Sequence, residues 1–414
     1  MQTLKALKSA IDKQLSASPT EVSIIELVDL LVEYAYSSRA SDIHIEPTDE
    51  NVAVRFRIDG LLHDTLSFSK EFQDEVITRI KVLSGLKTDI HHVPQDGRFK
   101  AKIAGLDEKN EYGEIDIRVS IAPTYYGENA VLRILAEAAQ NFTLEQLGFN
   151  KKQLAILDKS IKKPYGMILC NGPTGSGKTT TLYAFIKKLN TREISIITIE
   201  DPIEYSIEGI TQMPVAVGAG LTFANGLRSI LRQDPNVIMV GEIRDSETAN
   251  IAVNAALTGH LMLSTLHTND AATTFPRLID MGVPPFLVAS TLNVAIAQRL
   301  VRIACSSCRK QRTLSIAEIK SLGGIADKMT SDKVYTVGPG CSECGGSGYK
   351  SRIGIHEVLE VDDEIRSLIV GRADAAQIKQ MAVKRGMVPM IEDGLEKARE
   401  GITTIEEVLR IIYE

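Results

Sequence analysis

Hydrophobic residues recur with two different spacings along this chain of 414 residues. In the first third, apolar residues at every third or fourth position predict amphipathic helices, and strict alternation of apolar and polar residues predicts half-buried strands. The helical spacing occurs in residues 18–37 and 72–83, and the alternation occurs in residues 52–62 and 114–120. Residues 21–137 are therefore expected to form an α+β domain with antiparallel strands.

Local signals mark the ends of these elements. Ser18, Pro19 and Glu21 form the pattern of a helix N-terminus, with a capping hydroxyl, a proline at the first helical position and a carboxylate three residues after the cap. Asp59-Gly60 separates two apolar stretches and predicts the turn of a β-hairpin.

The pattern changes after Leu147, where short continuous apolar runs alternate with helical segments. Such runs are typical of parallel strands that are covered on both faces. The four candidate strands are Met167–Cys170, Ile194–Ile199, Val237–Val240 and Leu261–Leu266. Helical periodicity returns from Asp362 onward, so the second part of the chain predicts an α/β core followed by a helical segment.

A glycine-rich segment follows the first of these strands and precedes a predicted helix over Thr179–Leu189. It fits Gly-x4-Gly-Lys-[Ser/Thr], the pattern of a phosphate-binding loop. Its residues are Gly172, Pro173, Thr174, Gly175, Ser176, Gly177, Lys178, Thr179 and Thr180. Backbone N–H groups at the helix N-terminus would surround the phosphates, Lys178 would add a positive charge, and the Thr179 hydroxyl would bind Mg²⁺. The alternative, a glycine-rich turn without nucleotide, does not require a strand before the loop and a helix after it.

Polar side chains stand at the ends of other candidate strands. Glu242 follows Val237–Val240 and is the first candidate for the base that positions an attacking water. Glu200 ends the preceding strand and is the second candidate, as base or as metal support. His267 follows Leu261–Leu266 and can hydrogen-bond a γ-phosphate oxygen, unless it is an ordinary structural histidine. Because the carboxyl ends of parallel strands share one edge, these side chains are expected to lie beside the phosphate loop.

Four of the five cysteines form two Cys-x2-Cys pairs, separated by 32 residues. They are Cys305, Cys308, Cys341 and Cys344. Four thiolates complete a closed tetrahedral Zn²⁺ site, which predicts a structural metal rather than a catalytic one. The long spacer predicts an inserted helix over 315–322. Disulfides are the alternative, but they are rare in a reducing cytosol.

Composition and charge narrow the class of protein. A formal net charge of −6 and the absence of tryptophan provide neither a basic field nor the best stacking side chain, so no nucleic acid is expected as a partner. No apolar run approaches the roughly 20 residues that cross a bilayer, and the first residues contain no apolar signal core. A cytoplasmic location is therefore expected.

Together these residues resemble the secretion ATPases that drive type II secretion and type IV pilus assembly, and the resemblance covers nearly the whole chain. Three boxes of that family match residues 200–204, 232–245 and 259–270. The cysteine tetrad is similar to the metal-binding lobe of the secretion and pilus-extension members. Residues 40–47 and 94–98 resemble the family's second N-terminal domain, which has a PAS-like fold.

The resemblance implies a RecA-like P-loop ATPase core, a PAS-like N-terminal domain, a four-cysteine zinc lobe and a C-terminal helical region. The implied boundaries are 1–20 for an N-terminal arm, 21–137 for the PAS-like domain, 138–146 for a linker, 147–302 for the ATPase core, 303–349 for the four-cysteine metal-binding lobe and 350–414 for the helical region.

The resemblance also implies an activity and its residues. ATP would be hydrolysed with Mg²⁺ by a homohexamer, and Arg118 and Arg133 of the N-terminal domain would reach the nucleotide when that domain swings onto the core. Arg228 and Arg232 would be contributed by the core itself. Arginines that meet the γ-phosphate only in the closed state would couple hydrolysis to domain motion. An ordinary surface ion pair is the alternative for each of the four.

The implied partners are an inner-membrane platform protein and a membrane-anchored recruitment protein, which would place the motor peripherally at the inner membrane. Only about 20 residues precede the first domain, whereas family members often carry a further domain for recruitment. Recruitment is therefore expected to use the core alone, unless the system is reduced or the chain trimmed. The alternatives are a pilus-retraction or conjugation-type ATPase, which the cysteine tetrad disfavours, and a zinc-containing regulatory or nucleic-acid-binding protein switched by nucleotide.

Overall fold

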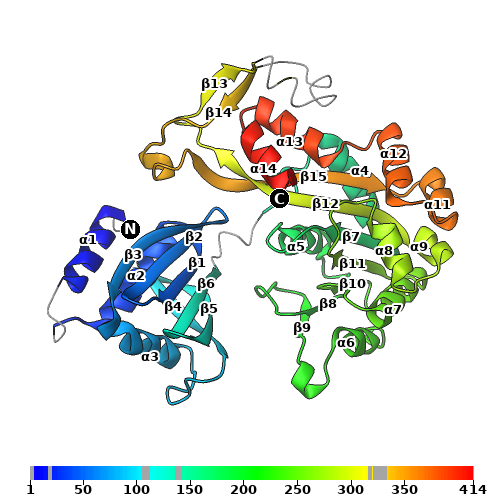
Figure 1. The fold of residues 1–414 in the computed structure, drawn as a ribbon. Helices are drawn as coiled ribbons and strands as arrows, with labels where there is room; N and C mark the ends of the chain where they lie inside the picture. Colours follow the sequence, from blue (N-terminus) through cyan, green and yellow to red (C-terminus); the bar gives the residue numbers. More distant parts are fainter. Residues whose placement is uncertain are drawn as a thin grey trace. The chain divides into compact units, whose positions relative to one another are not determined.

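The computed structural model describes residues 4–16, 21–104, 112–135, 142–315, 319 and 333–413. The chain divides into two compact units, unit 1 (1–141) and unit 2 (142–414) (Figure 1). The finer boundaries expected inside unit 2 stay predictions. None of the helices in the described ranges combines the length and the apolar character that crossing a bilayer requires.

Unit 1 is built on a six-stranded sheet in the order β3-β2-β1-β6-β5-β4, with every neighbouring pair antiparallel. Its elements are α1 (Leu4–Leu15), α2 (Ile24–Ser37), β1 (Ala40–Pro47), β2 (Asn51–Ile58), β3 (Leu61–Ser69), η1 (Lys70–Phe72), α3 (Gln73–Leu83), β4 (Gln95–Ala104), β5 (Tyr112–Thr124) and β6 (Gly127–Leu135). Asp59 and Gly60 have φ angles of 49° and 92°, as the predicted tight hairpin turn requires. The α+β organisation with antiparallel strands is confirmed, and the PAS-like assignment stays a prediction.

The first predicted helix begins later than Ser18 indicated. Its cap is Ser23, whose hydroxyl accepts the backbone N–H of Glu26 at 3.3 Å. Ser23 and Glu26 repeat the spacing of a capping signal five residues downstream of the first one, and the segment around Ser18 lies outside the described residues. The expected N-terminal arm contains a helix of its own, α1, which buries Leu7 and Ile11.

The two faces of the unit 1 sheet differ in character. Alternate strand residues pack with α2 and α3 into one apolar core that includes Ile43, Phe56, Ile117 and Leu132. Because successive strand residues point to opposite faces, the residues between them lie on the face away from this core.

Unit 2 contains a seven-stranded sheet in the order β15-β12-β7-β11-β10-β8-β9. All neighbours are parallel except β15, which runs antiparallel to β12. The four predicted strands appear as β7 (Gly166–Asn171), β8 (Ile196–Glu200), β10 (Val237–Val240) and β11 (Leu261–Leu266), and β9 (Thr211–Pro214) lies at the edge. The predicted α/β class with a parallel sheet is confirmed.

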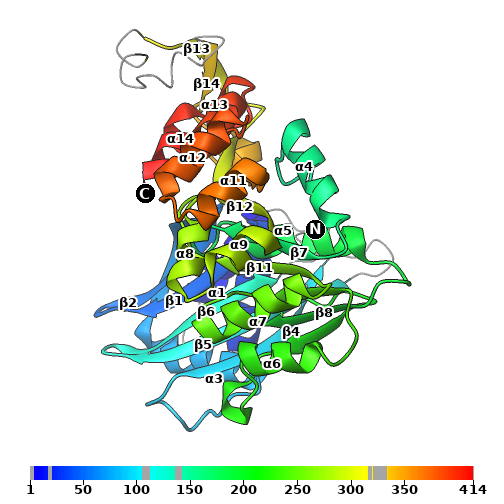
Figure 2. The same ribbon diagram turned by 90° about the vertical axis from the view of Figure 1, so that its right-hand side faces the viewer.

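Helices cover both faces of this sheet, which explains why its strands are continuous apolar runs (Figure 2). Residues of α4 and α5 pack on one face, and residues of α6 to α9 pack on the other. The helices are α4 (Lys151–Ile161), α5 (Lys178–Leu189), η3 (Val217–Ala219), α6 (Phe223–Ile230), α7 (Ser246–Leu257), α8 (Thr274–Asp280) and α9 (Pro285–Thr291).

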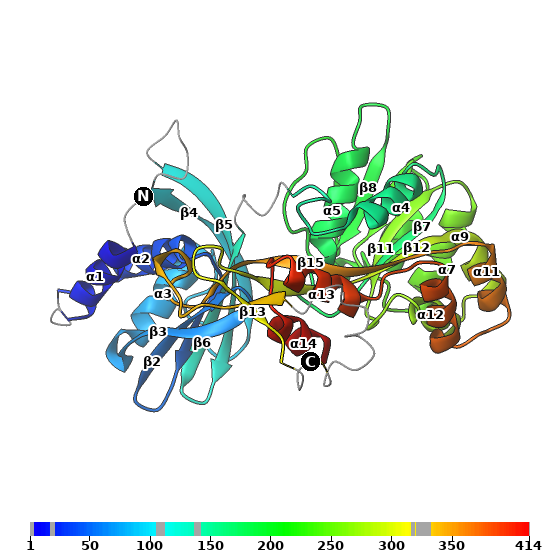
Figure 3. The same ribbon diagram turned by 90° about the horizontal axis from the view of Figure 1, so that it is seen from above.

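Two long strands, β12 (Leu292–Ala304) and β15 (Tyr349–Glu360), were not among those predicted (Figure 3). Gln298 and Arg299 interrupt the apolar run of β12, and His356 and Glu357 interrupt that of β15. The first residues of the expected C-terminal helical region, 350–360, therefore form a strand instead.

The remaining elements are β13 (Lys310–Thr313), β14 (Lys333–Thr336), η5 (Ser342–Cys344), α11 (Asp363–Val370), α12 (Ala375–Lys384), α13 (Met390–Arg399) and α14 (Ile405–Tyr413). Asp362 caps α11 by accepting the N–H of Ile365 at 3.0 Å, so helical structure resumes at the predicted position. Leu314, which follows β13, and Val334 of β14 share a small core with α13 and α14. The helix predicted over 315–322 falls mostly outside the described residues.

Candidate functional site

The glycine-rich segment forms a tight loop between β7 and α5. Gly172, Gly175 and Gly177 have φ angles of 142°, 78° and 88°, which other residues rarely adopt. A Cβ atom at Gly172 would lie 2.6 Å from the carbonyl oxygen of Gln298. Gly177 caps α5, which begins at Lys178, so the free N–H groups of the first turn border the loop. This is the geometry of an anion site at a helix N-terminus.

The Lys178 side chain lies within the loop. Its Nζ donates hydrogen bonds to the carbonyl oxygens of Gly172 at 2.8 Å and Pro173 at 2.9 Å. Burial lowers the pKa of Lys178, and the nearby Glu242 carboxylate opposes this shift. Thr179 and Thr180 are half-buried in the first turn of α5. The predicted phosphate-contacting residues are therefore neighbours in space as well as in sequence.

Gln298 of β12 holds the loop against α5. Its Nε2 donates to the carbonyl oxygen of Ser176 at 2.7 Å, and its Oε1 accepts from the Thr181 hydroxyl at 2.8 Å. The sequence analysis did not predict this role of Gln298. The residue stands out as a glutamine inside a largely apolar stretch, but no neighbouring residue indicates that it contacts the loop. The Ser176 Oγ is buried without a hydrogen-bond partner among the described residues, so the loop retains polar capacity for a ligand.

Glu242 and His267 meet at the carboxyl edge of the sheet, as their positions after β10 and β11 predicted. His267 Nε2 lies 3.2 Å from Glu242 Oε2, and Arg244 pairs with the same carboxylate. The Glu242 side chain is 12% exposed and that of His267 is 50% exposed. The Thr265 hydroxyl donates to the Gly241 carbonyl at 2.8 Å and ties the two strand ends together.

Glu200 has a different environment. Its carboxylate is buried and accepts hydrogen bonds from the Tyr183 hydroxyl, from the Thr198 hydroxyl at 2.6 Å and from Gln212 Nε2 at 3.1 Å. Burial raises the pKa of Tyr183, and the Glu200 charge acts in the same direction. Glu200 is thus held in a hydrogen-bond network with residues of α5 and β9. No pattern in the sequence predicted Tyr183, Thr198 or Gln212 as its partners.

The four predicted arginines lie in both units. Arg228 donates to Glu247 Oε1 at 2.6 Å, and Arg232 donates to the Arg228 carbonyl at 2.8 Å, both at the surface of unit 2. Arg118 and Arg133 lie on β5 and β6 of unit 1. Their approach to a nucleotide stays a prediction.

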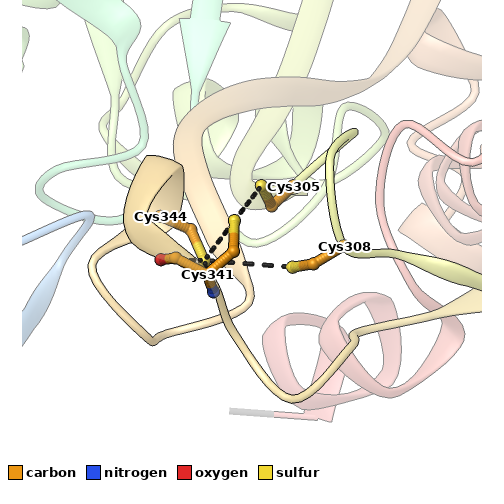
Figure 4. Close-up of side chains that lie close together, drawn as sticks. All are labelled: Cys305, Cys308, Cys341 and Cys344. Atoms are coloured by element: carbon orange, nitrogen blue, oxygen red, sulfur yellow. Dashed lines mark hydrogen bonds between the residues drawn. The ribbon is translucent and has the colours of Figure 1, made fainter.

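The four cysteines come together as predicted (Figure 4). Their Sγ atoms lie within 4.8 Å of one another, with 3.7 Å between Cys305 and Cys341 and 3.9 Å between Cys308 and Cys344. Disulfides are excluded, since all four are free thiols at these separations. Thiolates about 2.3 Å from a tetrahedral zinc would lie about 3.8 Å apart, so the cluster fits Zn²⁺.

Backbone N–H groups of the cysteine lobe point at one of these thiols. Cys341 and Gly348 donate to the Cys344 Sγ at 3.1 and 3.3 Å. Partial burial opposes ionisation, but these donors lower the pKa of Cys344 to about 6. The lobe therefore stabilises Cys344 as a thiolate, the form that binds a metal, whereas desolvation and the neighbouring thiols raise the pKa of Cys308 to about 12.

A parallel α/β sheet with this loop at a helix N-terminus and a carboxylate at the end of a neighbouring strand defines a P-loop nucleotide-binding protein. Over residues 18–410 the sequence matches the model of the family described as type II/IV secretion system protein. The chain belongs to this family, which confirms the resemblance seen in its motifs.

Individual relatives agree with the family. The chain is 42% identical over 397 residues to the type IV pilus assembly ATPase PilB of Myxococcus xanthus, covering 96% of this chain and 69% of the relative. It is 45% identical over 395 residues to the type II secretion system protein E of Pseudomonas aeruginosa, covering 95% and 76%. The solved structure of the pilus retraction motor PilT with bound ADP is similar, with a TM-score of 0.62 at 26% identity, covering 94% of this chain and 97% of that one.

Proposed function

We propose that this protein is a cytoplasmic motor that hydrolyses ATP to drive the assembly of type IV pili or type II secretion pseudopili. The observation that carries the proposal is the glycine loop with Lys178 at the N-terminus of α5, next to Glu242 and His267. The relatives named as pilus assembly ATPase and secretion protein E support the cellular role.

Residues 172–180 bind the triphosphate in this proposal. The N–H groups of the loop and of the first turn of α5 donate to phosphate oxygens, and Lys178 exchanges its two loop carbonyls for the β and γ phosphates. Thr179 is the protein ligand for Mg²⁺, an ion that neutralises charge on the phosphates when bound. Gln298 keeps the loop in place while the phosphates enter.

Glu242 is the proposed base that orients the attacking water and accepts its proton. His267 and Arg244 hold the carboxylate at the edge of the sheet, and His267 is exposed enough to contact the γ-phosphate instead. Glu200 is the second candidate for base or metal support. It would first have to give up its buried hydrogen bonds, at a cost on the order of 1–3 kcal/mol.

Coupling to movement is assigned to arginines. Arg118 and Arg133 of unit 1, with Arg228 and Arg232 of unit 2, contact the nucleotide in the closed state of a homohexamer and release it after hydrolysis. The closure and opening of the subunits then act on an inner-membrane platform protein, with recruitment through the core or through a membrane-anchored protein.

The cysteine cluster is proposed to hold a structural zinc. With four protein ligands no coordination position is left for a substrate, so the ion would stabilise the lobe around Cys305 and Cys341 rather than take part in hydrolysis. The cluster and the 42–45% identity to assembly and secretion relatives favour assembly over retraction, because the retraction motor is 26% identical.

Steady-state ATP hydrolysis by purified protein tests the proposal. Lys178→Ala should abolish turnover, and Glu242→Gln should abolish turnover while ATP still binds. Lys188→Ala is the matched control, since Lys188 lies on the same helix and pairs with Asp158 at 2.6 Å at the surface. Turnover by Lys178→Ala at the rate of this control would refute the site.

Subunit mixing tests the oligomeric part of the proposal. Glu242→Gln subunits mixed into wild type should lower turnover more steeply than their fraction, because a cooperative hexamer loses activity when one member is inactive. A strictly linear decrease would indicate that the subunits hydrolyse ATP independently.

A further inference from the structure

The segment between β11 and α8 carries His267 and has a defined shape. We call residues 267–273 the His267 loop. His267 is exposed and directly follows β11, so the sheet fixes the loop at one end. Further along, Asp270 Oδ1 accepts the backbone N–H of Thr273 at 2.8 Å and its hydroxyl at 2.5 Å. The Thr268 hydroxyl donates to the Asp270 carbonyl at 3.0 Å, which closes a turn directly after His267.

A buried carboxylate of β15 holds this loop from the neighbouring strand. The Glu357 side chain is 1% exposed, and its Oε1 accepts the backbone N–H of Ala271 at 2.8 Å. Its Oε2 accepts the backbone N–H of Met390, the first residue of α13, at 3.3 Å. Glu357 therefore joins three segments that are far apart in the sequence, namely the His267 loop, β15 and α13.

Lys379 of α12 forms a second contact between the loop and the C-terminal helices. Its Nζ lies 3.2 Å from Asp270 Oδ2 and 3.5 Å from Glu357 Oε2, so one ammonium group bridges two carboxylates. Burial opposes the charge on Lys379, but the two carboxylates raise its pKa. Burial also opposes the charge on Asp270, whereas hydrogen bonds from Thr273 and the charge of Lys379 lower its pKa. Lys379 and Asp270 therefore both carry their charges in the folded protein.

The residue after the loop contacts the strand that leads into the phosphate loop. Asn171 Nδ2 donates to the Thr274 hydroxyl at 2.7 Å, and both residues are buried. Asn171 directly precedes Gly172, and Thr274 is the first residue of α8. The His267 loop is thus fixed relative to the phosphate loop at one end and to the C-terminal helices in its middle.

These contacts suit a role in positioning better than a role in stability. Burying the Glu357 carboxylate costs free energy, and apolar side chains often stabilise such a position equally well. A hydrogen-bonded carboxylate instead fixes the direction of the Ala271 N–H, since hydrogen bonds weaken steeply when they are bent. Position matters here, because a displacement of about 1 Å near a reacting centre can lower a rate roughly 100-fold.

We infer that Glu357 and Lys379 are positioning residues for hydrolysis, which hold the His267 loop from β15 and α12 so that His267 reaches the γ-phosphate. This inference rests on the proposed function, which gives His267 its contact with the nucleotide but assigns no part in hydrolysis to β15 or α12. Neither residue contacts the nucleotide in this role, and both act through His267.

Lys379 provides the first test, because its side chain is 37% exposed and its replacement should leave the apolar core intact. Lys379→Ala should lower kcat several-fold and leave KM for ATP near wild type, since Lys178 still binds the phosphates. Lys379→Arg should recover most of the turnover, because a guanidinium can bridge the same two carboxylates. Lys384→Ala changes an exposed lysine of the same helix and should match wild type. Equal kcat values for Lys379→Ala and Lys384→Ala would overturn the inference.

A double-mutant cycle separates positioning from a structural role. Lys379→Ala should have no further effect on kcat in the His267→Ala background, because Lys379 acts through His267. A structural role would lower the melting temperature and would reduce kcat by the same factor in both backgrounds. That outcome would also overturn the inference.

Glu357→Gln tests the buried partner. Glutamine offers one acceptor oxygen where Ala271, Met390 and Lys379 present donors to two, so one of these contacts is lost. Its kcat should fall several-fold, and adding Lys379→Ala should lower it less than the product of the two single effects. Wild-type kcat in Glu357→Gln would show that the carboxylate does not position the loop. If this variant fails to fold, the Lys379 variants still decide the question.

The failure of this inference can be told apart from failure of the proposed function. If His267→Ala hydrolyses ATP like wild type, the proposed role of His267 is wrong and the inference falls with it. If His267→Ala loses turnover while Lys379→Ala and Glu357→Gln do not, the proposed function stands and only the inference fails.

Discussion

His267 Nε2 lies 3.2 Å from Glu242 Oε2, and this contact joins the ends of the parallel strands β11 and β10. The carboxylate is largely buried whereas half of the histidine side chain is exposed. The carboxylate is therefore the fixed partner of the pair, and the histidine is the partner that can rotate towards a phosphate.

Loss of His267 should slow hydrolysis without removing the nucleotide. His267→Ala is expected to lower kcat about tenfold or more and to leave ATP affinity near wild type, because Lys178 and the loop still bind the phosphates. His260→Ala is the control, since the His260 ring contacts the Ala255 carbonyl at 3.1 Å at the other end of the strand. Equal turnover by the two variants would contradict a role for His267.

The buried Glu200 network should contribute to stability. Tyr183→Phe removes one of its donors and should lower the free energy of unfolding by about 1–3 kcal/mol, because a buried carboxylate oxygen loses its partner. Chemical denaturation of the variant and of Tyr165→Phe, an exposed tyrosine, measures the difference. Equal denaturant midpoints for the two variants would show that this hydrogen bond does not contribute to the free energy of unfolding.

Metal analysis should find one zinc per chain, held by the four clustered cysteines. Cys341→Ser should release the metal and lower the melting temperature, since a ligand of a structural site is lost. Cys170→Ala, which changes the fifth cysteine in β7, should keep the metal. A wild-type protein without metal, or metal retained by Cys341→Ser, would count against the zinc site.

Stability should depend on His356 at acidic pH. Burial lowers the pKa of His356 well below its ordinary value, and the charge of Lys397 acts in the same direction. As the pH falls through ~6.5, His356 binds a proton in the unfolded chain but stays neutral in the folded protein. The contribution of His356 to the free energy of unfolding is therefore present above that pH and is lost below it. Each pH unit below ~6.5 should cost about 1.4 kcal/mol.

Thermal melts between about pH 7 and about pH 5.5 measure this dependence. His356→Phe should flatten the decrease in melting temperature, because phenylalanine can stack on Phe149 as the histidine ring does at 3.7 Å and does not titrate. His63→Phe, at an exposed position of β3, should follow the wild-type slope. Parallel slopes for all three proteins would show that His356 does not control the acid response.

Features with a fixed spacing could be predicted from the sequence. The glycine loop, the two Cys-x2-Cys pairs, and Glu242 and His267 after apolar strands depend on local order, and the structure brings each set together. A strand end alone does not say which partners a side chain will meet. Glu200 therefore has the predicted position at a strand end. Its hydrogen bond from the Tyr183 hydroxyl could not be predicted, because it depends on how α5 packs against the sheet.

Long-range partners explain the remaining differences. The polar residues in β12 and β15 are accommodated by groups far away in the chain, as when the N–H of His356 donates to Asp393 at 2.8 Å, so the apolar run that marks a buried strand is missing. The pairing of Arg118 with Arg133 across β5 and β6 was equally hidden, since it depends on the register of two strands. The sequence contains two capping signals before α2, and Ser23 rather than Ser18 caps this helix.

Strand β12 touches the phosphate loop at Gln298 and ends at Ala304, next to Cys305. At about 3.3 Å per residue, these two points lie roughly 20 Å apart on one strand. Strand β12 pairs with β7 along one edge and with β15 along the other, so its backbone is held on both sides. The phosphate loop contacts β12 near the middle of the strand, and the cysteine cluster begins directly after its end. If the cluster holds zinc as proposed, a chelator that removes the ion should therefore weaken nucleotide binding, although none of the four thiols belongs to the loop.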